Sequence, residues 1–238
     1  MGVIERHTVP VVRGTVALVL HLPSAPERVP CVIACHGLSA SKDSDKYLLL
    51  GEELPRAGLA LGRFDFRGCG ESSGTEEETT IASRLEDGRG VLGLLAGHSR
   101  LDGRFGLLGS SLGGFVALHL AAERGDGLPV VTWNAPATLE DLAEREDAQG
   151  IGRPFLLEFA QHRFAHAPEG VPRHLIIQGE ADEVVPLEHA TVLHATAGEP
   201  CDLVVIEGGD HRLTDMAHRR QAVAHSIGWF RRFFGADA

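Results

Sequence analysis

The sequence predicts an α/β protein built on a doubly wound, mostly parallel sheet with helices on both faces. Short apolar strands alternate with helical stretches along the 238-residue chain, which is typical of repeated βαβ units. Several strands are continuous apolar runs, as expected where a parallel sheet is buried on both faces. The length fits a single domain over residues 1–238, with a short cap-like insertion at 137–170.

Seven segments are predicted to be strands. The clearest is CVIACHG at 31–37, because it is a continuous apolar run that ends in His-Gly. The strands are expected at 15–23, 31–37, 59–66, 104–110, 128–136, 173–180 and 202–209.

Five segments carry helical patterns. Ser44 stands at the N-cap position of the first helix, and Pro55 must end or bend that helix. Gly125 is the expected stop of the third helix. The helices are expected at 44–58, 80–97, 112–125, 186–198 and 218–234.

The segment 137–170 breaks this alternation because it is longer than a standard crossover. Its first half is acidic with a helical pattern, and its second half contains Phe155, Phe159 and Phe164. We expect it to lie over the sheet edge and to roof a pocket with these aromatic rings. It is too short for a full lid domain, so small to medium substrates are expected.

The charge balance excludes some classes of partner. Lys and Arg number 22 and Asp and Glu 33, giving a formal net charge of −11. A nucleic-acid binder or a protein that docks on anionic lipid needs a basic face, so neither partner is expected. Arg219, Arg220, Arg231 and Arg232 lie on the last predicted helix, where we expect solvated or dipole-facing charges.

Cysteine usage and hydropathy favour a cytoplasmic protein. The four cysteines are scattered, and Cys31 and Cys35 fall inside an apolar run where free cysteine is usually a small core residue. The start of the chain has no apolar signal core, and no run approaches the ~20 apolar residues of a membrane span. Neither CxxC nor HExxH occurs, so no metal site is predicted.

Polar, glycine-rich segments follow five of the predicted strands. In an open parallel sheet, functional residues collect at the carboxyl ends of strands. These segments are HGLSASKDS (36–44), DFRGCGESSG (65–74), GSSLGG (109–114), GEADEVVP (179–186) and GGDHRL (208–213). Together they contain a serine, an aspartate and a histidine.

The segment GSSLGG contains the pattern G-x-S-x-G, with Ser111 between Gly109 and Gly113. A strand that turns sharply into a helix crowds the residues two before and two after the bend, so both must be small. Ser110 does not fit, because Leu108 would occupy the first small position. The pattern therefore predicts that Ser111 is at the apex, with its hydroxyl exposed as a nucleophile.

A serine nucleophile needs a base, and the base needs an orienting acid. His211 follows the last predicted strand and Asp182 follows the one before it, which gives the order serine, acid, histidine expected for this turn. Asp210 is a second candidate acid, but adjacent side chains in an extended loop tend to point apart. We therefore predict Ser111, Asp182 and His211 as the catalytic residues.

These five segments together resemble the α/β-hydrolase superfamily, in its small esterase-like form with a minimal cap. The resemblance covers about residues 14–234. It implies acyl transfer to Ser111 and hydrolysis by water that His211 activates, with no cofactor and no metal. It also implies an oxyanion hole formed by the backbone N–H groups of Leu38 and Leu112.

The resemblance gives supporting roles to four further residues. His36 is expected to be structural, and Gly37 is expected to let the chain approach the reacting carbonyl. Asp65 and Arg67 are expected to brace the oxyanion loops by a charge-assisted hydrogen bond. Serine at the elbow argues against the relatives that use cysteine there for dienelactones or aspartate for dehalogenation.

The motifs are less specific for the substrate than for the fold. The expected partner is a small-molecule ester, and the chain is expected to be a monomer or a homodimer. A thioesterase or small peptidase would use the same triad, and an acyltransferase would differ only by excluding water. A non-catalytic protein that binds a ligand in the same pocket is the alternative from another class.

Overall fold

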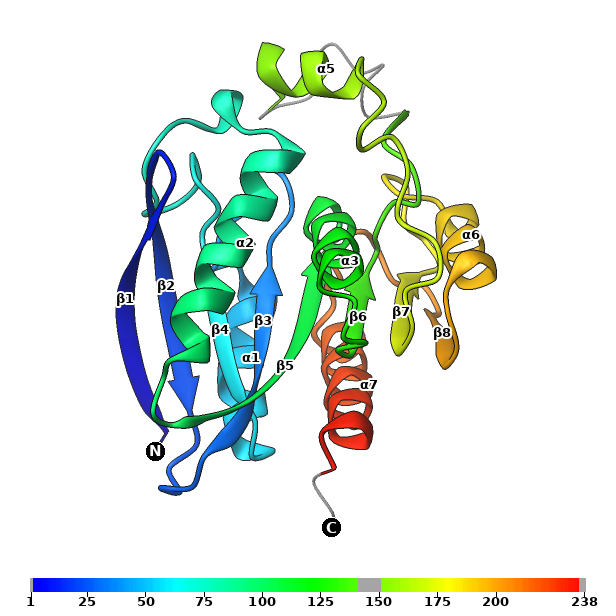
Figure 1. Ribbon diagram of the computed structural model, residues 1–238. Helices are drawn as coiled ribbons and strands as arrows, with labels where there is room; N and C mark the ends of the chain where they lie inside the picture. Colours follow the sequence, from blue (N-terminus) through cyan, green and yellow to red (C-terminus); the bar gives the residue numbers. More distant parts are fainter. Residues whose placement is uncertain (1, 141–150, 236–238) are drawn as a thin grey trace.

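The computed structural model describes residues 2–140 and 151–235 and shows a twisted sheet between two layers of helices (Figure 1). The eight strands lie in the order β1-β2-β4-β3-β5-β6-β7-β8. Strands β1 and β2 are antiparallel to their neighbours, and the other neighbouring strands run parallel. The predicted fold class is confirmed.

Seven of the strands fall in the segments that the sequence predicts. The eight strands are β1 (Val3–Val11), β2 (Gly14–Leu22), β3 (Val29–Cys35), β4 (Ala60–Phe64), β5 (Leu101–Ser110), β6 (Val130–Trp133), β7 (His174–Gly179) and β8 (Cys201–Ile206). Only β1 has no counterpart in the prediction. It is an edge strand whose residues are mostly exposed, so it lacks the apolar run that marks the others.

The helices are divided between the two faces of the sheet. They are α1 (Asp45–Arg56), α2 (Ile81–Ala96), α3 (Leu112–Arg124), α5 (Arg153–Phe159), α6 (Leu187–Thr196) and α7 (Met216–Phe234), with a 3-10 turn η1 at Glu76–Glu78. Helices α2, α3 and α6 pack on one face, and α1 and α7 on the other (Figure 1).

The central strands alternate their side chains between two apolar cores. In β3, Cys31 and Ile33 belong to the core under α2 and α3, whereas Val32 and Ala34 belong to the core under α1 and α7. This alternation follows from the two-residue period of a strand. It explains why a strand covered on both faces has no polar position in its sequence.

Helix α5 lies above the carboxyl ends of the strands rather than over a side edge of the sheet (Figure 1). The Glu158 carboxylate accepts hydrogen bonds from the N–H groups of Ile81 (2.6 Å) and Ala82 (3.0 Å) at the start of α2. The acidic part of the insertion at 141–150 lies outside the described residues. No helix in the described part of the chain is long and apolar enough to cross a bilayer.

Candidate active site

Ser111 lies between the end of β5 and the start of α3, in a strained backbone conformation. Its φ of 55° and ψ of −131° are unusual for a residue with a side chain. A Cβ on Gly109 would lie 2.2 Å from the carbonyl oxygen of Gly113, and one on Gly113 would lie 2.1 Å from that of Cys35. The crowding therefore explains both glycines of the G-x-S-x-G pattern.

The structure brings Ser111, His211 and Asp182 into one hydrogen-bonded row. His211 Nε2 lies 3.1 Å from Ser111 Oγ, and His211 Nδ1 lies 2.8 Å from Asp182 Oδ2. Because Asp182 can only accept at Nδ1, the neutral imidazole carries its proton there and leaves Nε2 free to accept the serine proton. The row has the geometry of a nucleophile, a general base and an orienting acid.

Asp182 is held by its own loop in the position that faces His211. Its side chain is fully buried, and Oδ1 accepts hydrogen bonds from the N–H groups of Val184 and Val185, both at 2.8 Å. Asp210 points elsewhere, since its carboxylate accepts from the N–H (2.9 Å) and hydroxyl of Thr214. Of the two candidate acids, Asp182 is the one that contacts the imidazole.

Asn134 is a positioning residue that the sequence analysis missed. It follows β6 with a φ of 51°, and its amide nitrogen donates to the carbonyl oxygens of Asp210 (3.1 Å) and His211 (2.8 Å). Its amide oxygen accepts from the N–H of Gly179 (2.7 Å). Asn134 thus ties the histidine loop to the end of β7. The polar residue after the run VVTW was the only available signal.

The residues predicted for the oxyanion hole lie beside Ser111. Leu112 is the first residue of α3, so its N–H has no intrahelical acceptor and lies at the positive end of the helix dipole. Leu38 lines the same cavity as Ser111. Gly37 packs against the nucleophile, because a Cβ there would lie 3.1 Å from Ser111 Cβ. His36 accepts from the N–H of Phe66 at Nε2, which fits its expected structural part.

Asp65 holds the loop that follows β3. It accepts from the backbone N–H of Lys42 (2.7 Å) and from Lys42 Nζ (2.8 Å). Lys42 also bonds Glu71 and Asp43; burial lowers the pKa of Lys42, but these three carboxylates raise it overall. The partner of Asp65 is therefore Lys42, which the sequence analysis did not single out.

Arg67 braces helix α2 and makes no hydrogen bond to Asp65 among those of the described residues. Its Nε donates to Asp87 (2.6 Å), and its other nitrogens reach Glu86 and the carbonyl oxygen of Ser83. Asp65 and Arg67 stand two residues apart, but each has separate partners. Their charge-assisted bonds thus fix two different segments around the site.

A cavity of about 630 Å³ opens beside Ser111 and His211. Its apolar walls come from Leu38, Leu112, Pro136, Leu139, Val184 and Val185. Phe155, Phe159 and Phe164, which were expected to roof the pocket, pack instead against the apolar core under α2 and α3. Large rings on a short insertion gain more by burial in that core than by covering an open cavity.

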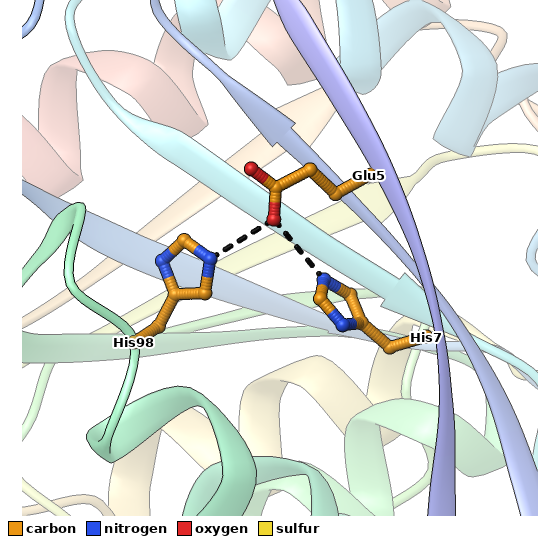
Figure 2. A group of neighbouring side chains, drawn as sticks. All are labelled: Glu5, His7 and His98. Atoms are coloured by element: carbon orange, nitrogen blue, oxygen red, sulfur yellow. Dashed lines mark hydrogen bonds and ion pairs between the residues drawn. The ribbon is translucent and has the colours of Figure 1, made fainter.

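One group of potential metal ligands lies far from this site, where β1 passes the turn before β5 (Figure 2). Glu5 Oε2 lies 3.0 Å from His98 Nε2 and 3.3 Å from His7 Nε2. His98 Nδ1 accepts from the N–H of Arg100, so its proton is on Nε2 and is donated to Glu5. This hydrogen bond accounts for the close approach of Glu5 and His98.

Two family models match the chain over overlapping halves. Residues 26–144 match the model described as serine aminopeptidase, S33, and residues 101–237 match the prolyl oligopeptidase family. The chain belongs to the α/β-hydrolase superfamily of serine hydrolases. The resemblance seen in the sequence is confirmed at this level.

The chain is similar to curated proteins and to solved structures. YfhR of Escherichia coli K12 is 27% identical over 79% of this chain, and the alignment covers 64% of the length of YfhR. The mouse palmitoyl-protein thioesterase ABHD10, mitochondrial, is 27% identical over 80% of the chain and 71% of that protein. The structure of Est1E from Butyrivibrio proteoclasticus with ferulic acid shares the fold, with a TM-score of 0.81, 21% identity, and coverage of 97% of this chain and 100% of that chain.

Proposed function

We propose that the hydrolase is a serine carboxyl-ester hydrolase that forms an acyl-enzyme on Ser111. The hydrogen-bonded row from Asp182 through His211 to Ser111, open to a cavity with apolar walls, carries this proposal. The cavity volume of about 630 Å³ suits a small to medium acyl or alcohol group. No cofactor takes part in the proposed reaction.

The proposed reaction has two chemical steps. Ser111 Oγ attacks the ester carbonyl carbon while its proton passes to His211 Nε2, and Asp182 stabilises the imidazolium. The oxyanion accepts hydrogen bonds from the N–H groups of Leu38 and Leu112, and His211 then protonates the departing alkoxide. Water attacks the acyl-enzyme as His211 removes its proton, which releases the acid and restores Ser111.

A thioesterase is the second candidate, because a relative that aligns with 80% of the chain is described as a palmitoyl-protein thioesterase. The same catalytic residues would serve, with a thiolate as the leaving group. A small peptidase, an acyltransferase and a non-catalytic ligand-binding protein remain alternatives. We keep a cytoplasmic location as part of the proposal; the four cysteines, all unpaired, support it.

Paired substrate series test the proposal. Oxygen esters and thioesters of the same acyl chains, from acetyl to palmitoyl, would be compared by kcat/KM in wild type and Ser111→Ala. We expect butyrate-length oxygen esters to be turned over faster than long-chain esters, with Ser111→Ala inactive. Faster thioester turnover would favour the second candidate, and no turnover of either series would contradict both. Added alcohol or amine acceptors separate acyl transfer from hydrolysis.

A further inference from the structure

A second cavity, of about 390 Å³, meets the first one at the nucleophile. The two cavities share part of their lining, namely Leu38, Ser111, His211, Arg212 and Thr214. The walls specific to the second cavity come from the loop after β3, the first turn of α1 and the start of α7, whereas those of the first come from the segments after β6 and β7. A bound ester at Ser111 can therefore extend in two directions.

The second cavity is lined by three cations. Lys46 projects from the first turn of α1, Arg212 follows His211, and Arg219 lies on α7. Arg219 is 7% exposed and lies in the first turn of α7, so the expectation of a solvated or dipole-facing charge is wrong for this arginine. Among the described residues, the acid in the lining is Asp45, which is 3.5 Å from Arg219 and whose side chain is 79% exposed. The lining therefore has a net positive charge.

Lys46 has a neutral hydrogen-bond partner instead of a carboxylate. It is half-buried, and its Nζ donates to Ser110 Oγ at 2.8 Å. Within residues 2–140 and 151–235, no carboxylate lies at ion-pair distance from this ammonium, whereas Lys42 four residues earlier contacts three. A lysine in a cavity with one neutral partner keeps two N–H donors for an anion.

The charges around Lys46 also favour the binding of an anion. Burial, and after it the nearby charges of Arg219 and Arg212, lower the pKa of Lys46 to about 8, although Asp210 and Asp182 act in the opposite sense. The site thus places three cations together, with Asp45 beside Arg219 as the acid in its lining. The N-terminus of α1, a helix of 12 residues, adds its positive dipole end to the same wall.

We propose that this second cavity binds an anionic group of the substrate, a carboxylate or a phosphate, through Lys46, Arg212 and Arg219. The preferred substrates are esters or thioesters with an apolar part on one side of the scissile bond and an anion on the other. The inference rests on the proposed function and narrows its substrate class.

Two pairs of matched esters test the proposal. Mono-4-nitrophenyl glutarate and its neutral form, 4-nitrophenyl methyl glutarate, place the charge on the acyl side. 4-Acetoxybenzoate and methyl 4-acetoxybenzoate place it on the leaving-group side. We expect kcat/KM for the charged member of at least one pair to be about tenfold higher at low salt, the size of a charge-assisted hydrogen bond. Ratios near one in both pairs, with the neutral esters hydrolysed, would overturn the anion pocket and leave ester hydrolysis standing.

Substitutions test whether these side chains cause the preference for the charged ester. Lys46→Met removes the ammonium and keeps the alkyl chain, and Arg212→Gln is a second variant at an exposed position. Arg220→Gln is the matched control, since Arg220 is exposed on α7 and lies outside the cavity lining. We expect the ratio of charged to neutral kcat/KM to approach one in the first two variants and to stay at the wild-type value in the control. An unchanged ratio in Lys46→Met and Arg212→Gln would overturn the proposal.

A binding measurement separates this proposal from ester hydrolysis. Monomethyl glutarate would be titrated calorimetrically into Ser111→Ala and into Ser111→Ala with Lys46→Met. We expect binding that weakens about tenfold when Lys46 is replaced, and weakens with added salt. If such binding is found but the wild-type protein hydrolyses neither esters nor thioesters, the result would support the anion pocket and contradict the proposed function. Equal binding by both variants would overturn the pocket.

Discussion

The residue at the apex of the β5–α3 turn depends on two neighbours that have no side chain. Gly113 faces the carbonyl oxygen of Cys35 so closely that a Cβ would lie 2.1 Å from it. Gly113→Ala should therefore lower the free energy of unfolding by roughly 2–4 kcal/mol, as overpacking against backbone does, and should displace Ser111. Chemical denaturation and ester turnover would measure the two effects.

Gly93→Ala is the control for that substitution. Gly93 lies in α2 with nothing within 4 Å of an added Cβ, so alanine there should stabilise the protein by up to about 1 kcal/mol. Equal effects of the two substitutions would show that crowding at the turn is not what requires glycine.

The choice of orienting acid is testable with two conservative changes. Asp182→Asn should lower kcat by several orders of magnitude, about 10⁴-fold in the serine-protease precedent, because an amide cannot stabilise the imidazolium. Asp210→Asn should keep at least a tenth of the activity, since Asp210 bonds Thr214 rather than His211, a barrier change below ~1.4 kcal/mol. Both values of kcat would be measured on folded protein. A larger loss in Asp210→Asn would remove Asp182 from the triad.

At the residue scale, the sequence predicts which side chains lie together where the fold determines their position. Parallel strands bring their carboxyl ends to one edge of the sheet, so Ser111, Asp182 and His211 can be placed together from strand order alone. Asn134 and Lys46 cannot, because their contacts cross between loops with no local pattern. The partners of Asp65 and Arg67 could not be predicted for the same reason. Asp65 bonds Lys42 in a loop, and Arg67 bonds Asp87 on a helix.

At the scale of elements, burial decides what could be predicted. Seven strands read as apolar runs and the sequence locates all of them, including the edge strand β8 with its run LVVI. The edge strand β1 could not be located, because Glu5, Arg6 and His7 interrupt its apolar residues. The rings of the insertion were assigned to the wrong surface, since their aromatic character does not distinguish a cavity roof from the core under α2 and α3.

The contact between α5 and α2 gives an element-scale prediction. Glu158 accepts from two N–H groups at the start of α2, where a negative charge also meets the helix dipole. Glu158→Ala should lower the free energy of unfolding by about 1 kcal/mol, as the loss of a helix cap does, and should increase hydrogen exchange in Arg153–Phe159. Denaturation and hydrogen exchange with mass spectrometry would measure both changes.

Glu123→Gln is the control for the α5 contact. Glu123 pairs with Arg89 on the surface, so its replacement should cost less than about 0.5 kcal/mol and leave exchange in α5 unchanged. Unaltered exchange in Glu158→Ala would show that this carboxylate does not hold α5.

At the scale of the whole molecule, four histidines make stability depend on pH. Burial lowers the pKa of His36, of His21 to about 4 and of His174 to about 3. These groups stay neutral in the folded protein but bind protons near pH 6.5 when unfolded. Stability is therefore complete above pH 6.5 and is lost as pH falls toward 4. Burial also lowers the pKa of His119 to about 4, so four protons contribute and the slope should reach about 5 kcal/mol per pH unit.

Denaturation curves from pH 7.5 to 4.5 would measure this slope. Removing one titrating group with His174→Gln should reduce the slope by about a quarter, because His174 contributes one of the four protons. A free energy of unfolding that stays constant between pH 6.5 and 5 would contradict the assignment of these histidines as neutral.

Labelling by a fluorophosphonate tests the central claim most directly, since only a serine paired with a base is nucleophilic enough to react. The protein has two adjacent serines at the turn, so the modified residue would be identified by peptide mapping in wild type, Ser111→Ala and Ser110→Ala. The account predicts a single adduct on Ser111, its persistence in Ser110→Ala and its loss in Ser111→Ala. An adduct that survives in Ser111→Ala, or no adduct in the folded wild-type protein, would contradict it.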